Sequence, residues 1–137
     1  SGWSLLHVIY SSIQDAINDA SPGETVLVHP GTYNEQVVIN KQLTLNGANA
    51  DVNAVTGTRG SESIIDGGTS TAVTTSAGDV IVNGFTLDGG ITLDDLANSI
   101  SGGTISNNII TGADSSEEPT KAQNGIRLGW DNGRGVD

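Results

Sequence analysis

The segment 25–47 constrains the fold more than any other part of the chain, because three short β-rich runs follow one another across turns of a few residues. The runs are Val26–Val28, Val37–Ile39 and Leu43–Leu45, and the strand-breaking pair Pro30-Gly31 follows the first. They are too short for a sandwich sheet and too close together for parallel neighbours joined by helices. They suit the successive sides of one coil of a parallel β-solenoid.

Residues 11–20 have the pattern of a short capping helix. Ser11 and Gln14 fit a capping box, and Ser21-Pro22-Gly23 follows as a stop signal. One apolar stripe at helical spacing contains Ile13, Ala16, Ile17 and Ala20. We expect this helix to lie over the open end of a solenoid core and to block strand pairing there.

Residues 80–112 contain an internal repeat, which is typical of stacked structural units. The segment 80–89 resembles 104–112, and matching Gly84-Phe85 to Asn108-Ile109 gives an offset of 24 residues. This offset lies within the period of solenoid repeats. The repeat therefore favours coils of similar size stacked along one axis.

Stacking would align equivalent side chains from coil to coil. Residues 90–93 and 125–128 are predicted to occupy one strand position in consecutive coils, and the polar segment 48–63 is predicted to be a loop. Core stacking is expected of Val80, Val82 and Phe85 with Ile100, Ile105 and Ile109. A ladder of side-chain amides is expected from Asn83, Asn107 and Asn108.

The composition limits the classes of partner. The chain has 137 residues, with 16 acidic and 5 basic side chains and a net charge of −11. This charge opposes binding to nucleic-acid phosphates and to anionic membranes. No apolar run approaches the roughly 18 residues that cross a bilayer, and without cysteine there is no thiol chemistry. We expect one domain over 1–137, no nucleic-acid partner and no membrane insertion.

The two ends suggest a piece of a longer product. The chain contains no methionine and begins with Ser, and Ser1–Tyr10 lacks the basic start and the length of a signal peptide. Coils are expected over 25–129, with a C-terminal end that is uncapped or truncated. Because such an end exposes backbone donors and acceptors, it would allow end-to-end pairing of copies.

Several motifs within 11–112 resemble a known superfamily. They include Ser12-Ile13-Gln14-Asp15-Ala16-Ile17, Pro30-Gly31-Thr32-Tyr33-Asn34-Glu35 and Leu43-Thr44-Leu45-Asn46-Gly47. Together they resemble the opening of right-handed parallel β-helix proteins of the pectin-lyase-like superfamily, such as the pectin methylesterases. The stretch that contains Gly47-Ala48-Asn49 and Arg59–Gly67 is most similar to bacterial surface and secreted members.

The resemblance implies an all-β fold, namely a right-handed single-stranded parallel β-helix (a β-solenoid) with a short N-terminal capping helix. It also implies an extracellular or cell-surface location. It does not imply one activity, because the same fold hosts lyases, esterases, adhesins and inert stalks.

Four aspartates follow predicted strands at similar points in their coils, namely Asp66, Asp88, Asp94 and Asp95. Stacked on one face, their carboxylates would offer oxygen ligands to Ca²⁺, the one candidate cofactor, or would divide into acid and base roles. The simpler interpretation is turn formation, because Asp66 and Asp88 each precede glycine.

Three further residues are candidates for polysaccharide chemistry. Arg127 is the basic residue that lies in a predicted strand. The resemblance implies that lyases of this superfamily use an Arg or Lys base near Ca²⁺. In this chain Arg127 would be that base and would act with Asp66, Asp88 and Asp94. Tyr33 and Trp130 can stack on sugar rings. The alternatives are a surface arginine, a tyrosine that braces the Pro30-Gly31 turn, and a tryptophan that covers the last coil.

These observations support three functions of different classes. The first is an extracellular or cell-surface module, structural or polysaccharide-binding, within a larger protein. The second is the N-terminal part of a Ca²⁺-dependent polysaccharide lyase or related enzyme, and the third is an end-to-end assembly element. The enzyme interpretation is the weaker one, because the Asp-Pro-His stretch of the epimerases and the catalytic segments of the methylesterases do not occur in the chain.

Overall fold

The computed structural model describes residues 9–93, 101–112 and 126–128, and within them three parallel sheets of four strands each. Sheet A contains β1 (Thr25–Leu27), β4 (Thr44–Asn46), β7 (Ile81–Asn83) and β10 (Thr104–Ser106). Sheet B contains β2 (Gly31–Asn34), β5 (Ser63–Asp66), β8 (Thr86–Asp88) and β11 (Ile109–Thr111). Sheet C contains β3 (Val37–Ile39), β6 (Val73–Thr75), β9 (Ile91–Leu93) and β12 (Ile126–Leu128).

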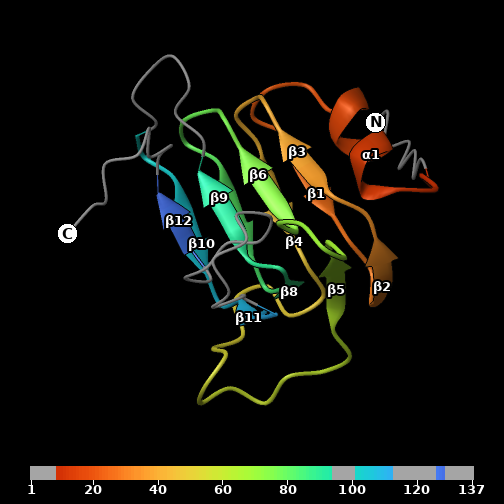
Figure 1. Ribbon diagram of the computed structural model, residues 1–137, viewed down its shortest axis with the longest axis vertical. Helices are drawn as coiled ribbons and strands as arrows, with labels where there is room; N and C mark the ends of the chain where they lie inside the picture. Colours follow the sequence, from red (N-terminus) through yellow and green to blue (C-terminus); the bar gives the residue numbers. More distant parts are fainter. Residues whose placement is uncertain (1–8, 94–100, 113–125, 129–137) are drawn as a thin grey trace, which may run out of the picture.

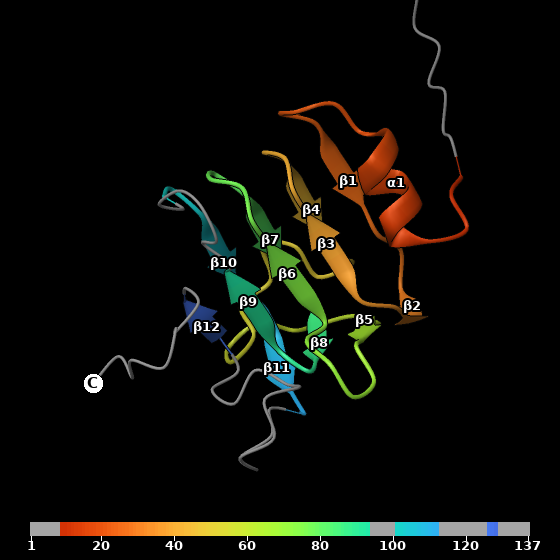
Figure 2. The same ribbon diagram turned by 45° about the horizontal axis from the view of Figure 1, so that its top comes forward.

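The chain visits the three sheets in turn and then returns to the first, which makes it a parallel β-solenoid, as predicted. Each coil contributes one strand to each sheet, so that strands far apart in the sequence lie side by side (Figures 1 and 2). Every strand pair is parallel, with Val26 beside Leu45 and Leu45 beside Val82 in sheet A.

The sides of the first coil differ from those predicted. Leu43–Leu45 was expected to be the third side, but β4 stacks on β1 and begins the second coil. The side that the prediction lacked is β2, which lies between β1 and β3 in the chain and pairs with β5. It begins at Gly31, which was predicted to form a turn with Pro30. This strand is hard to detect in the sequence because Tyr33 is its one side chain packed against the core.

The repeat has a period of 23 residues, and the predicted offset of 24 is wrong by one. Ile105 lies beside Val82, and Asn108 lies opposite Phe85, with which it shares a hydrogen bond. The error arose because Asn107 replaces Gly84 at a left-handed position, with φ of 55° and 83° respectively. Asn tolerates this conformation better than other non-glycine residues.

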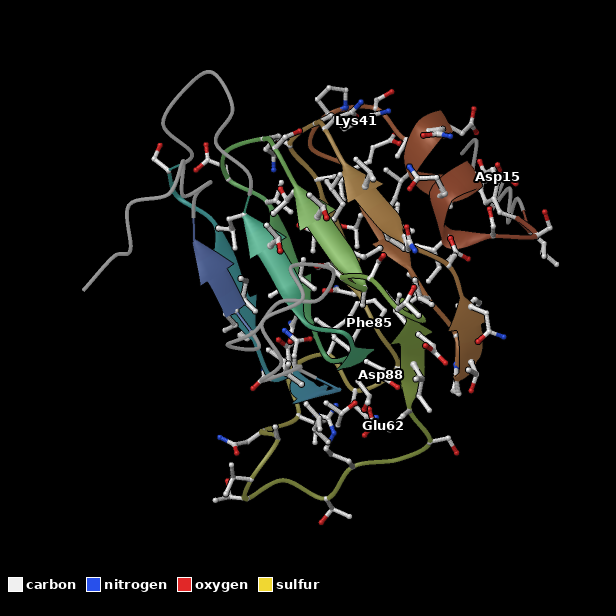
Figure 3. All side chains as sticks on the ribbon, in the orientation of Figure 1. Asp15, Lys41, Glu62, Phe85 and Asp88 are labelled. Carbon is white, nitrogen blue, oxygen red and sulfur yellow. The ribbon has the colours of Figure 1, made fainter. Side chains whose placement is uncertain are left out.

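The core is a narrow column of aliphatic side chains with Phe85 inside it (Figure 3). The expected stack of Val82 on Ile105 is confirmed. The expected place of Ile109 is wrong: this residue lies opposite Thr86, and its neighbour Ile110 packs against the core beside Leu87. Ile100 lies outside the described residues.

The capping helix is α1 (Ile13–Asp19), and its cap is Ser12 instead of the predicted Ser11. The Ser12 hydroxyl accepts a hydrogen bond from the Asp15 backbone N–H at 3.1 Å. As predicted, the apolar stripe faces the core, with Ile13 and Ile17 buried. Figures 1 and 2 show α1 at the end of the solenoid where β1 and β3 lie.

Both ends of α1 are held by side chains of the first coil. The Glu35 carboxylate accepts hydrogen bonds from the backbone N–H groups of Ile13 and Gln14, at 3.1 and 2.9 Å. The Lys41 ammonium donates to the backbone oxygens of Asn18 and Ala20, at 3.1 and 2.9 Å. Negative charge at the start of a helix and positive charge at its end both stabilise it.

Candidate functional site

Two of the four predicted aspartates are brought together. Asp66 and Asp88 are directly paired neighbours at the ends of β5 and β8, and the same row begins with Asn34 at the end of β2. Neighbouring strands lie about 4.8 Å apart, so these polar residues form a strip along the edge of sheet B. Asp94 and Asp95 lie outside the described residues, and the strand before them, β9, belongs to sheet C.

The local contacts of the pair agree with turn formation. Asp66 Oδ1 accepts a hydrogen bond from the Gly68 N–H at 2.8 Å, which closes the turn after β5. Asp88 lies against the left-handed Gly112 of the next coil, so close that a Cβ atom there would collide with Asp88 Oδ1. Among the described residues, no three His, Cys, Asp or Glu side chains gather as a metal site would require.

A shallow, open hollow of about 320 Å³ lies beside this strip. Gln36 closes one side of it by donating from Nε2 to the Gly67 carbonyl at 3.3 Å. The residues around the hollow are Asn34, Glu35, Gln36, Asp66, Gly67 and Gly68. Because Glu35 bonds to α1 and Gln36 bonds to Gly67, Asn34 and Asp66 are the side chains of the hollow that could bind a hydroxyl group of a ligand.

The other predicted site residues do not join this strip. Arg127 lies in β12 of sheet C, where its backbone pairs with Thr92, whereas the paired aspartates lie in sheet B. Tyr33 packs against the core and donates from its hydroxyl to the His29 carbonyl at 3.0 Å. This contact matches the expected bracing of the Pro30-Gly31 turn. Trp130 lies outside the described residues.

A charged cluster that sequence reasoning missed joins the long loop 47–62 to the coils. The Arg59 guanidinium forms a two-pronged ion pair with Glu62, at 2.6 and 2.9 Å. It also donates to the carbonyls of Val52, Phe85 and Asn107, and Thr86 donates from Oγ1 to Glu62 at 3.1 Å. The three-residue spacing of Arg59 and Glu62 was the only signal available in the sequence.

The electrostatics of this cluster are those of a structural ion pair. The hydrogen bond from Arg59 lowers the pKa of the Glu62 carboxyl below its ordinary value, and the bond from Thr86 acts in the same direction. The same hydrogen bond raises the pKa of Arg59. Every prong of the guanidinium is engaged with protein oxygen atoms, so Arg59 is a structural residue and no candidate base.

Comparison with known proteins gives one informative similarity. No protein-family model matches the chain, and no solved structure matches it. The chain is 34% identical over 107 residues to a cell surface glycoprotein of Methanothermus fervidus. The similar region is 76% of this chain and 16% of that protein, so the chain spans about a sixth of the relative's length. No helix among the described residues is long and apolar enough to cross a membrane.

Proposed function

We propose that the chain is a β-solenoid module of a larger cell-surface protein, in which it acts chiefly as a rigid structural unit. The observation that supports this most is the similarity to a cell surface glycoprotein over 76% of the chain. The similarity covers only 16% of that protein, as expected of one module among several.

The internal construction of the chain suits a structural role. The core is continuous through the three sheets, and the loop 47–62 is held to two further coils through Arg59. The polar residues around Arg59 form hydrogen bonds with one another. Such a network rigidifies a structure and leaves few polar groups free to bind a ligand or to react with it. A rigid spacer needs these properties and needs no active site.

The word glycoprotein in the relative's name raises the question of where sugars would attach. The 137 residues contain no Asn-x-Ser or Asn-x-Thr triplet with any central residue. N-linked sugars of that kind therefore have no acceptor in this chain.

The surface location is tested on intact cells of the source organism. Antibodies raised against the purified chain should label intact cells, and a membrane-impermeant biotin reagent should modify its amino groups there. A cytosolic protein serves as the negative control. Labelling that appears only after lysis would contradict the proposal.

Polysaccharide binding is the second candidate function, and the strip of Asn34, Asp66 and Asp88 with its hollow favours it. Electrophoresis through gels that contain pectin, polygalacturonate, alginate or a cellulose derivative tests it. Retarded migration is expected with the neutral cellulose derivative, or with an anionic polymer when Ca²⁺ is added to bridge its carboxylates to those of the strip, and Asp88→Asn should weaken it. Asp15→Asn is the matched control, because it removes the same charge from α1, at a distance from the strip (Figure 3).

The same gels address the lyase alternative. A zone of cleared polysaccharide that requires Ca²⁺ would favour a lyase and would make Asp66 and Asp88 the first residues to substitute, with a base other than Arg127, which lies in sheet C. Equal retardation of Asp88→Asn and Asp15→Asn would show that the strip of sheet B is not the binding surface. Unretarded migration in every gel would leave the structural role alone.

A further inference from the structure

Four strands of sheets A and B end in the same kind of residue pair, an Asn or Asp followed by glycine. In such a pair the backbone nitrogen of the glycine attacks the preceding side chain most readily, because glycine has no Cβ atom to crowd its nitrogen. These Asx-Gly pairs, where Asx stands for Asn or Asp, end β4, β7, β5 and β8 and are Asn46-Gly47, Asn83-Gly84, Asp66-Gly67 and Asp88-Gly89.

The chemistry open to such a pair is succinimide formation. The glycine nitrogen attacks the side-chain carbonyl carbon of the preceding Asn, an N–C bond forms, and the bond from that carbon to the side-chain nitrogen breaks. The side-chain nitrogen leaves as ammonia and takes the proton of the glycine N–H. Water then opens the ring to aspartate or to isoaspartate, in which the main chain runs through one additional carbon. An Asp loses water in place of ammonia.

In all four pairs the glycine N–H donates a hydrogen bond to the next coil. The acceptor is the carbonyl of the residue that is paired with the Asx, so the four bonds are one repeated rung of the parallel ladders. The donors and acceptors are Gly47 to Asn83 at 2.8 Å, Gly84 to Ser106 at 3.2 Å, Gly67 to Asp88 at 2.9 Å and Gly89 to Thr111 at 2.9 Å. Because this bond holds both the proton and the nitrogen of the glycine, it opposes the attack.

The strand conformation is a second obstacle to the reaction. Ring closure requires the Cβ atom of the Asx to eclipse the glycine nitrogen about the Cα–C bond, whereas the extended backbone of a strand turns these two atoms apart. Each Asx is the last residue of its strand. The ring can therefore close only after the rung to the next coil has opened, and such local opening costs free energy in a packed structure.

The two asparagines differ in how their side chains are held. Asn83 donates from Nδ2 to Asp51, and its Oδ1 accepts from the Asp51 N–H and from Asn107, so turning this side chain breaks three hydrogen bonds. The Oδ1 atom of Asn46 is buried and has no hydrogen-bond partner among the described residues. A buried acceptor without a partner is destabilised, and no bond to this oxygen opposes rotation of the side chain toward Gly47.

We propose that each coil protects the Asx-Gly pairs of the coil before it from succinimide formation, and that Asn46 is the described residue at which the folded chain first deamidates. This modification has a structural consequence, because isoaspartate at position 46 adds a main-chain carbon at the end of β4 and displaces its rung to β7. The inference rests on the stacking of the coils, and it holds whether or not the module binds sugar.

Incubation of the full chain, followed by peptide mapping with mass spectrometry, tests the protection. Asn46-Gly47 and Asn83-Gly84 are the same dipeptide, so they should deamidate at similar rates in urea, where the coils are unfolded. In the folded chain both rates should fall at least tenfold, and Asn46 should react at least threefold faster than Asn83. Raising the pH accelerates the reaction, so the incubation can be continued until one of the two pairs has reacted.

A variant of Asn107 tests whether side-chain bonds determine which asparagine reacts first. Asn107→Gly suits the left-handed backbone at this position, where φ is 55°, and it removes the hydrogen bond to Asn83 Oδ1. Deamidation at Asn83 should accelerate at least threefold, while the rate at Asn46 stays unchanged. Asp79→Gly is the matched control, since it makes the same change at a left-handed residue before β7 and should alter neither rate.

Three results would overturn the proposal. The first is deamidation as fast in the folded chain as in urea, which would show that the rungs give no protection. The second is faster reaction at Asn83 than at Asn46 in the folded chain. The third is an equal effect of Asn107→Gly and Asp79→Gly, which would trace the acceleration to general loosening of the coils. Circular dichroism melts of both variants should confirm that they fold.

Discussion

The Asn107 side chain donates a hydrogen bond from Nδ2 to Oδ1 of Asn83, at 2.9 Å, across a separation of 24 residues in the sequence. Asn83 in turn donates from Nδ2 to Oδ1 of Asp51 at 2.9 Å, and its Oδ1 also accepts from the Asp51 N–H. Three successive levels of the solenoid are thereby joined by side chains outside the aliphatic core. The ladder predicted for Asn83 and Asn107 is thus present, whereas Asn108 bonds to the backbone of Val82 and Phe85.

Replacement of Asn83, the central residue of this ladder, tests how much the ladder contributes to the free energy of unfolding. Asn83→Ala should lower the free energy of unfolding by about 2–4 kcal/mol, because it leaves the polar groups of Asp51 and Asn107 without their partner. Urea unfolding measures the change. Asn34→Ala, at an exposed amide of β2, is the control and should stay within about 0.5 kcal/mol. Equal losses for both variants would show that the ladder contributes nothing specific.

Alanine substitutions at Gly84 and Gly68 distinguish the stability cost of a steric clash from the cost of a left-handed backbone conformation. Both have positive φ, of 83° and 66°. A Cβ atom on Gly84 would collide with the backbone of Ala50, whereas one on Gly68 would meet nothing within 4 Å. Gly68→Ala should therefore cost about 1 kcal/mol for the left-handed conformation alone, and Gly84→Ala should cost several times more. Thermal unfolding measures both, and similar melting temperatures would contradict the close packing at Gly84.

Sequence patterns predicted the parts of the fold that depend on burial. Alternation in Val37–Ile39 and the apolar stripe of α1 each place side chains in the core, and both predictions are confirmed. The strand β2 was missed because, of Gly31-Thr32-Tyr33-Asn34, only Tyr33 packs inward. The repeat was misaligned by one residue because the register at Asn107 is defined by the left-handed conformation of a turn. No apolar side chain marks that position in the sequence.

The candidate site was less predictable than the fold. The pairing of Asp66 with Asp88 follows from their common place after strands, and the structure confirms that the two are neighbours. The contacts of Arg59 depend on how a 16-residue loop returns to the coils, for which the sequence has no periodic signal. Long-range contacts of irregular segments are determined by tertiary geometry, so the pattern of the sequence cannot reveal them.

The Arg59–Glu62 ion pair makes stability depend on pH. Because the pKa of Glu62 is lowered in the folded state, its stabilising contribution is present above the unfolded-state pKa of about 4.5 and is lost as pH falls through the folded-state value. Glu62→Gln should therefore be less stable than wild type at pH 7, by about 1–3 kcal/mol. The difference should shrink as the pH falls below 4.5. Urea unfolding at pH 3 to 7 measures it, and a constant difference would contradict the assignment.

The geometry of the arginine fork gives a separate prediction. Arg59→Lys keeps the positive charge but cannot serve Glu62 and three carbonyl oxygens at once. It should lose at least half of the stability that Arg59→Ala loses, with Arg59→Ala costing about 3 kcal/mol. Differential scanning calorimetry measures both variants. A lysine variant as stable as wild type would show that charge alone matters at this position.

Gln14 blocks the edge of sheet C by imitating a neighbouring strand. Its Oε1 accepts a hydrogen bond from the Val38 N–H at 2.8 Å, and its Nε2 donates to the Val38 carbonyl at 3.0 Å. Gln14→Ala should free this edge, and exposed strand edges promote aggregation. Amide hydrogen exchange at Val38 should accelerate by more than tenfold. Gln14→Glu is the matched comparison, because a carboxylate still accepts from the Val38 N–H but sets its second oxygen against the Val38 carbonyl, so it should keep only part of the protection. Unchanged exchange in Gln14→Ala would show that α1 covers this edge without the glutamine.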